Sequence, residues 1–90
     1  MLSYEDVLGL CHLCDEEVRA IADHEHIPDI VAAELGDYLV QTEDGVMKVR
    51  RMIIDDMADA TRRGDRDALL KYKAVLLHFI ETHPPGSAPA

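Results

Sequence analysis

The sequence has few of the residues on which enzymatic catalysis usually depends. It contains two serines, Ser3 and Ser87, and two cysteines, Cys11 and Cys14. It has no glycine-rich stretch that could form an oxyanion hole or a phosphate-binding loop. We therefore expect that the chain is not an enzyme.

Long hydrophobic runs are also absent. No apolar run approaches the length of about 18 residues that crosses a bilayer, and residues 1–6 lack the basic and apolar regions of a secretory signal. Two cysteines three positions apart do not make the disulfide framework of a small secreted protein. These absences predict a soluble cytoplasmic protein with no membrane partner.

Basic residues are scarce, with 9 Lys and Arg against 18 Asp and Glu and a net charge of −9. The imbalance lies in residues 1–45, which carry 12 acidic side chains and one basic side chain, Arg19. The negative electrostatic field of these side chains opposes binding to nucleic acid, because the affinity of proteins for nucleic acid comes mostly from Lys and Arg at phosphates. We expect no nucleic-acid partner, and the acidic half could instead face a basic protein partner.

The residues that are present predict helices. The chain has 90 residues, of which 48% are hydrophobic, enough for one small domain near the margin of stability. Apolar residues recur at three- and four-residue spacing, with no strand-like alternation. We predict an all-α fold, a small compact bundle of four to five helices over residues 1–83, followed by a disordered Pro/Ala/Ser tail over 84–90.

Residues that cap or break helices place the segments at about 3–11, 15–26, 28–39, 46–63 and 65–82. Cys14 occupies an N-cap position, and Gly64 suits the end of the fourth segment. The run Glu43-Asp44-Gly45 reads as a turn.

The segment 65–82 is apolar around more than half of its circumference, and the other segments barely suffice to bury it. We therefore expect part of this surface to meet a second copy of the chain. The residues predicted for this interface of a homo-oligomer, most simply a dimer, are Leu69, Tyr72, Leu76, Phe79 and Ile80.

Histidines and carboxylates give an alternative hypothesis, a transition-metal site. His24 and His26 lie close in sequence, but on one helix they point about 200° apart and cannot share an ion. They are also suited to the end of a helix, where positive charge is favoured. A metal site would therefore combine side chains from several segments, with candidates His24, His26, Glu34, His78 and His83.

The cysteines form a CxxC motif, Cys11-His12-Leu13-Cys14, which can bind one zinc ion or close one disulfide. No second CxxC or HxxxH pair accompanies it, so Cys11 as a core residue and Cys14 as an N-cap are the simpler interpretation.

Two functional hypotheses follow. The first is a non-enzymatic, self-associating protein-interaction or regulatory module without a cofactor. The alternative is a transition-metal-binding helical bundle with ligands among His24, His26, Glu34, His78 and His83, to which the cysteines could be added.

Overall fold

Four helices make up most of residues 13–84, the part of the chain that the computed structural model describes. They are α2 (Asp15–Glu25), α3 (Asp29–Leu39), α4 (Glu43–Arg63) and α5 (Arg66–Thr82). Residues 13–84 contain no strand, so the predicted all-helical fold is confirmed. The helix predicted at 3–11 and all but Pro84 of the predicted tail fall outside the described residues.

Most helix ends lie at the capping residues that the sequence indicates. Cys14 is the N-cap of α2. Gly64 ends α4 in the left-handed conformation, with φ 70°, which glycine adopts without strain. Asp65 follows as the N-cap of α5 and accepts a hydrogen bond from the amide of Ala68 at 3.0 Å. This two-residue connection turns the chain back, so α4 and α5 run antiparallel.

The beginning of α4 differs from the prediction, because Glu43, Asp44 and Gly45 form its first turn and not a loop. The hydroxyl oxygen of Thr42 accepts a hydrogen bond from the amide of Gly45 at 3.0 Å. The two carboxylates lie at the positive end of the helix dipole, where they are stabilising. Residues typical of a turn are thus equally suited to a capped helix start.

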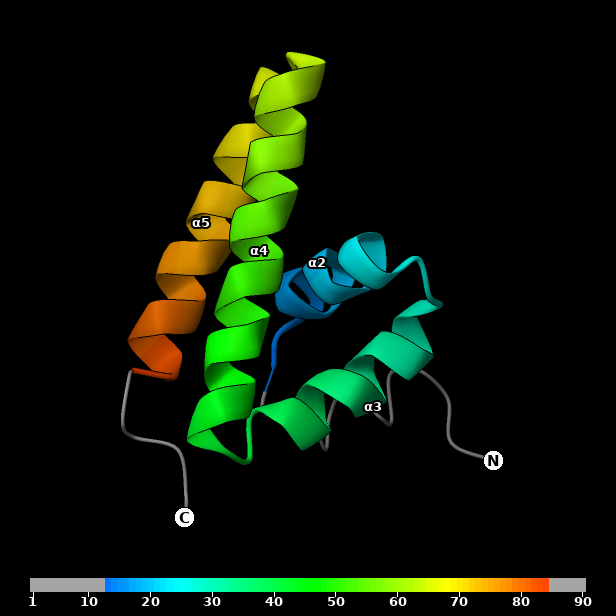
Figure 1. The fold of residues 1–90 in the computed structure, drawn as a ribbon, viewed down its shortest axis with the longest axis vertical. Helices are drawn as coiled ribbons and strands as arrows, with labels where there is room; N and C mark the ends of the chain where they lie inside the picture. Colours follow the sequence, from blue (N-terminus) through cyan, green and yellow to red (C-terminus); the bar gives the residue numbers. More distant parts are fainter. Residues whose placement is uncertain (1–12, 85–90) are drawn as a thin grey trace.

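The helices form two pairs, as Figure 1 shows. α4 and α5 lie side by side along most of their length, and they share the most extensive helix contact of the fold. α2 and α3 lie across one side of α4, toward the end where α4 begins. α2 contacts all three other helices, and it therefore connects the pairs.

The core lies where α2 meets α4 and α5. Its largest fully buried side chains are Phe79, Ile21, Ile53, Val18 and Val49, and a carboxylate, Glu17, is buried with them. Burial of a carboxylate is costly unless it is paired and hydrogen-bonded. The surroundings of Glu17 are therefore a candidate functional site. Among residues 13–84, no helix is both long and apolar enough to cross a membrane.

Candidate metal site

Glu17 is held at the first turn of α2. As the third residue after the N-cap, it points back toward the helix start, and its Oε1 accepts a hydrogen bond from the amide of Cys14 at 2.9 Å. The flanking residue Val18 packs in the core, and Glu17 itself is only 1% exposed. Helix capping thus places a carboxylate and a thiol side by side at the edge of the core.

α5 supplies the third side chain, His78. It lies between two buried residues of that helix, Val75 and Phe79, which fix the face that α5 turns toward the core. His78 Nδ1 lies 3.1 Å from Glu17 Oε2 and 3.8 Å from Cys14 Sγ. A residue 61 positions beyond Glu17 in the chain therefore completes the cluster.

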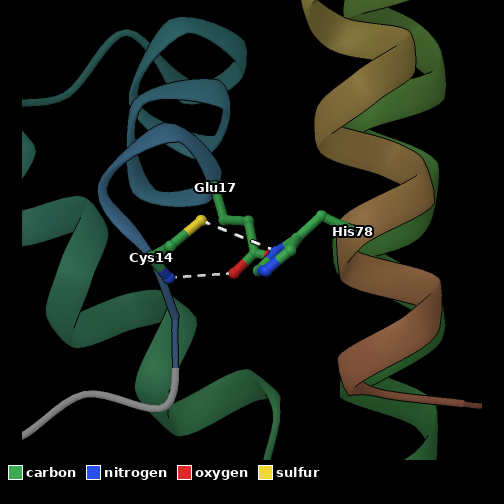
Figure 2. A group of neighbouring side chains, drawn as sticks. All are labelled: Cys14, Glu17 and His78. Carbon is green, nitrogen blue, oxygen red and sulfur yellow. Dashed lines mark hydrogen bonds and ion pairs between the residues drawn. The ribbon is translucent and has the colours of Figure 1, made fainter.

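The three side chains converge on one point, as Figure 2 shows. One donor atom from each, the sulfur of Cys14, a carboxylate oxygen of Glu17 and a ring nitrogen of His78, lies within 4.8 Å of the other two. Among residues 13–84, this is the group of His, Cys, Asp and Glu side chains close enough to share an ion. Thiolate, imidazole and carboxylate are the three protein ligands that zinc uses.

The same geometry does not suit a nucleophilic cysteine. In a Cys–His–acid arrangement, the thiol and the acid contact opposite nitrogens of the imidazole. The acid orients the ring, and the thiol gives its proton to the ring. Here Glu17 and Cys14 both approach Nδ1 of His78. Burial, together with the negative charge of Glu17, also raises the pKa of the Cys14 thiol to about 11. Without a cation, the thiol therefore stays protonated and unreactive at neutral pH.

The cluster opens onto a shallow pocket of about 270 Å³. Its lining consists of Cys14, Glu16, Ala74, Val75 and His78. The carboxylate of Glu17 is buried, whereas the side chain of His78 is about half exposed. The pocket thus gives access to Cys14 and His78, whereas Glu17 does not line it.

Of the five metal ligands predicted from the sequence, only His78 belongs to this cluster. His24 instead bonds Asp55 at 3.0 Å, and His26 is the exposed C-cap of α2, with φ 57°. Glu34 is exposed on α3, and His83 stacks on Phe79 with 4.6 Å between ring centroids. The histidines and Glu34 are thus spread over separate parts of the fold.

Glu17 was missed as a candidate ligand, whereas Cys14 had been considered through the CxxC motif. A signal for Glu17 is present, because a glutamate three residues after an N-cap residue is the mark of a capping box. That pattern indicates that the carboxylate lies beside Cys14, but it says nothing about His78. Cys11, the first cysteine of the motif, falls outside the described residues.

A second polar cluster joins the end of α2 to the middle of α4 and to α5. The hydroxyl of Tyr72 donates to Asp23 at 2.7 Å. Burial lowers the pKa of His24, but hydrogen bonds to Asp55 and Glu25 outweigh this effect, so the pKa lies above its usual value. The donor atoms of this cluster do not lie at the mutual distances of a metal site.

Asp56 lies beside this second cluster and is 8% exposed. Its Oδ2 atom is buried and has no hydrogen-bond partner among residues 13–84. Burial raises the pKa of this carboxyl group to about 7, and the nearby negative charges of Asp23 and Asp55 act in the same direction. Asp56 is therefore a source of pH-dependent stability.

The residues predicted for self-association lie on the inward-facing part of α5. Phe79 is 0% exposed and packs in the chain's own core, so it is not available to a partner in this structure. The other four, Leu69, Tyr72, Leu76 and Ile80, are half-buried. The large apolar residues that α5 exposes are Leu70 and Leu77, which the prediction did not include.

Comparisons with known proteins add no assignment, because no family model, no curated protein and no solved structure matches this chain.

Proposed function

We propose that the protein binds one divalent transition-metal ion through Cys14, Glu17 and His78. The observation that carries the proposal is the convergence of a sulfur, an oxygen and a nitrogen atom within 4.8 Å of one another around a carboxylate that is 1% exposed. A bound cation would neutralise that buried charge and stabilise the thiolate form of Cys14. The proposal is thus the metal-binding alternative raised by the sequence, with a different set of ligands.

The mixed ligand set favours zinc among the divalent ions. Thiolate and imidazole bind zinc and neighbouring transition metals, whereas magnesium and calcium prefer ligand sets of oxygen atoms alone. Three protein ligands also leave one position of a tetrahedral site open, and this position would face the pocket beside Ala74.

A metal at this position would stabilise the fold as well. Cys14 and Glu17 belong to the start of α2 and His78 belongs to α5, so one ion would connect two helices across the edge of the core. Because the ligands have no common position in the unfolded chain, the binding energy adds to folding stability. Affinity would rise with pH as Cys14 loses its proton more easily.

The test is a Co²⁺ titration of the full chain, followed by absorption spectroscopy and by competition with Zn²⁺. The proposal predicts one equivalent of bound Co²⁺ with sulfur-to-cobalt charge-transfer absorption, displaced by Zn²⁺. Cys14→Ser should abolish that absorption, and His78→Gln should weaken binding at least about tenfold. His78 is half exposed, so its replacement leaves the core intact.

Two variants serve as matched controls, because they replace ligands that the sequence predicted and the structure places elsewhere. Glu34→Gln and His83→Gln should bind Co²⁺ as the unmodified chain does. The proposal fails if His78→Gln binds with unchanged affinity, or if the bound cobalt shows no sulfur band.

A further inference from the structure

The outer face of α5 carries an apolar stripe that α2, α3 and α4 leave uncovered. Leu70 is 55% exposed and Leu77 is 60% exposed, and the exposed Lys73 and Ala74 lie between them, one on each side of the line that joins the two leucines. Residues spaced by three, four and seven positions lie on one side of a helix, here the side opposite the buried Val75 and Phe79. The helix therefore has one face in the core and a second apolar face toward solvent.

Charges of opposite sign stand at the two ends of this stripe. Arg66 lies four residues before Leu70, and Glu81 lies four residues after Leu77. Both are exposed, and neither has an ion-pair partner among residues 13–84. The order Arg66, Leu70, Leu77, Glu81 is therefore symmetric about the midpoint of α5, with opposite charges at its ends.

These two charges also oppose the dipole of their own helix. Arg66 is the first residue of α5, at the positive end of the dipole, and Glu81 is in its last turn, at the negative end. Each position favours the opposite charge. The local stability of α5 therefore does not account for this arrangement, whereas a partner with the opposite order of charges does.

We infer that the outer face of α5 pairs with the same face of a second copy, antiparallel and about a two-fold axis near Ala74. In that pair, Leu70 of one copy meets Leu77 of the other, and Arg66 of one copy meets Glu81 of the other. Each contact occurs twice, as a two-fold interface requires. Ala74 and Lys73 both lie where the helices cross. The small side chain of Ala74 permits close approach, and the long stem of Lys73 allows its ammonium group to reach solvent at the edge of the interface.

The other exposed apolar pairs lack this symmetry. Val31 and Tyr38 on α3, and Met47 and Ile54 on α4, are also seven residues apart and exposed. The positions four residues beyond each pair carry Ile27 with Thr42 and Glu43 with Ala58, so neither pair is flanked by opposite charges. The outer face of α5 is therefore the one whose pattern complements itself.

The dimer is independent of the proposed metal site. Ala74 lines the pocket at the metal site, so the second copy would lie beside the mouth of that pocket. None of the paired residues is a ligand, although Ala74 and His78 lie one helical turn apart on α5. Cys14→Ser should therefore remain dimeric, and failure of one proposal leaves the other standing.

The test is sedimentation equilibrium of the full chain and of charge-exchange variants. The unmodified chain should be a dimer, and Arg66→Glu alone or Glu81→Arg alone should weaken it about tenfold by placing like charges together. The double variant Arg66→Glu/Glu81→Arg restores both ion pairs with their signs exchanged. Its dimer affinity should therefore return to that of the unmodified chain. Both changes also suit the helix dipole, so the variants should fold.

Lys71→Glu is the matched control, because Lys71 is exposed on α5 away from the stripe, and its dimer should be unchanged. Leu77→Glu should give a folded monomer, since Leu77 packs against nothing in the core. A monomeric unmodified chain, including one that binds only a basic protein, overturns the inference. So does a double variant that is no better than the two single ones.

Discussion

Asp56 lies on α4 with one carboxyl oxygen buried and without a hydrogen-bond partner among the described residues. The ionisable groups that influence it come from α2, α4 and α5, and they are Asp23, His24, Asp55, Asp59 and Tyr72. Burial and the neighbouring carboxylates raise the pKa of Asp56 from 3.8 to about 7. The folded state thus binds a proton that the unfolded chain releases between these values, and stability falls as the pH rises through this range.

His24 also makes the stability of the fold decrease as the pH rises. Its pKa is raised in the folded state by Asp55 and Glu25, although burial acts against this rise. The charged form is therefore stabilising at low pH, and this contribution is lost as the pH rises through the folded pKa. Both groups make the domain more stable in mild acid than at pH 8.

Asp56→Asn removes the cost of a buried negative charge. At pH 8 we expect this variant to gain about 1 kcal/mol, or roughly 4 to 8 °C in Tm. Its stability should also change less between about pH 4 and pH 7, because the titrating group is gone. Thermal unfolding followed by circular dichroism at several pH values measures both effects.

Asp67→Asn, at an exposed position in the first turn of α5, is the control and should leave the pH dependence unchanged. A loss of stability at pH 8 in Asp56→Asn would show that the carboxylate is paired after all.

At the scale of the helices, most boundaries follow from local chemistry that the sequence displays. Gly64 ends α4 because it adopts a left-handed conformation, and Cys14 precedes α2 as its cap. The prediction was wrong at Glu43-Asp44-Gly45, because acidic residues and glycine suit a turn and a first helical turn alike. The hydroxyl of Thr42, which decides between the two, was not weighed.

Gly45 also has a packing role at this boundary. A Cβ atom at this position would collide with the backbone carbonyl of Leu39, at the end of α3. Backbone cannot yield as a side chain does, so Gly45→Ala should shift the α3–α4 connection and cost about 2 to 3 kcal/mol. Urea unfolding measures this loss.

Gly36→Ala is the comparison variant for Gly45→Ala. A Cβ atom there would meet the side-chain ends of Leu13 and Ile21, which can move, and alanine favours the helix by about 1 kcal/mol. Its net effect should therefore be clearly smaller than that of Gly45→Ala. Equal losses in the two variants would contradict the role given to the α3–α4 connection.

At the scale of the whole molecule, the sequence predicts the helical bundle but not its cluster of ligands. Helical periodicity and caps are local, and they place Glu17 beside Cys14 at the start of α2. The approach of His78 depends on how α5 packs on α2, a contact between residues 61 positions apart. For the same reason, Phe79 was assigned to an interface, although the core of the chain itself buries it.

The packing of the helices also separates the side chains that the sequence predicted as ligands of one metal ion. The sequence predicted a metal site with ligands from several segments, among them the histidine-rich end of α2. In the structure, His24 is engaged by carboxylates and His26 is exposed, while the ligand atoms that converge lie at the opposite end of α2. Among residues 13–84, only Cys14 and Glu17, at the start of α2, and His78, on α5, bring ligand atoms together.

Native mass spectrometry of the full chain, purified without chelator and supplied with one equivalent of Zn²⁺, measures whether Cys14, Glu17 and His78 bind a metal ion. One zinc mass per chain is expected, retained by Glu34→Gln and His83→Gln, lost from Cys14→Ser and reduced in His78→Gln. A chain that carries no zinc, or that carries it equally well without His78, would contradict the proposed coordination.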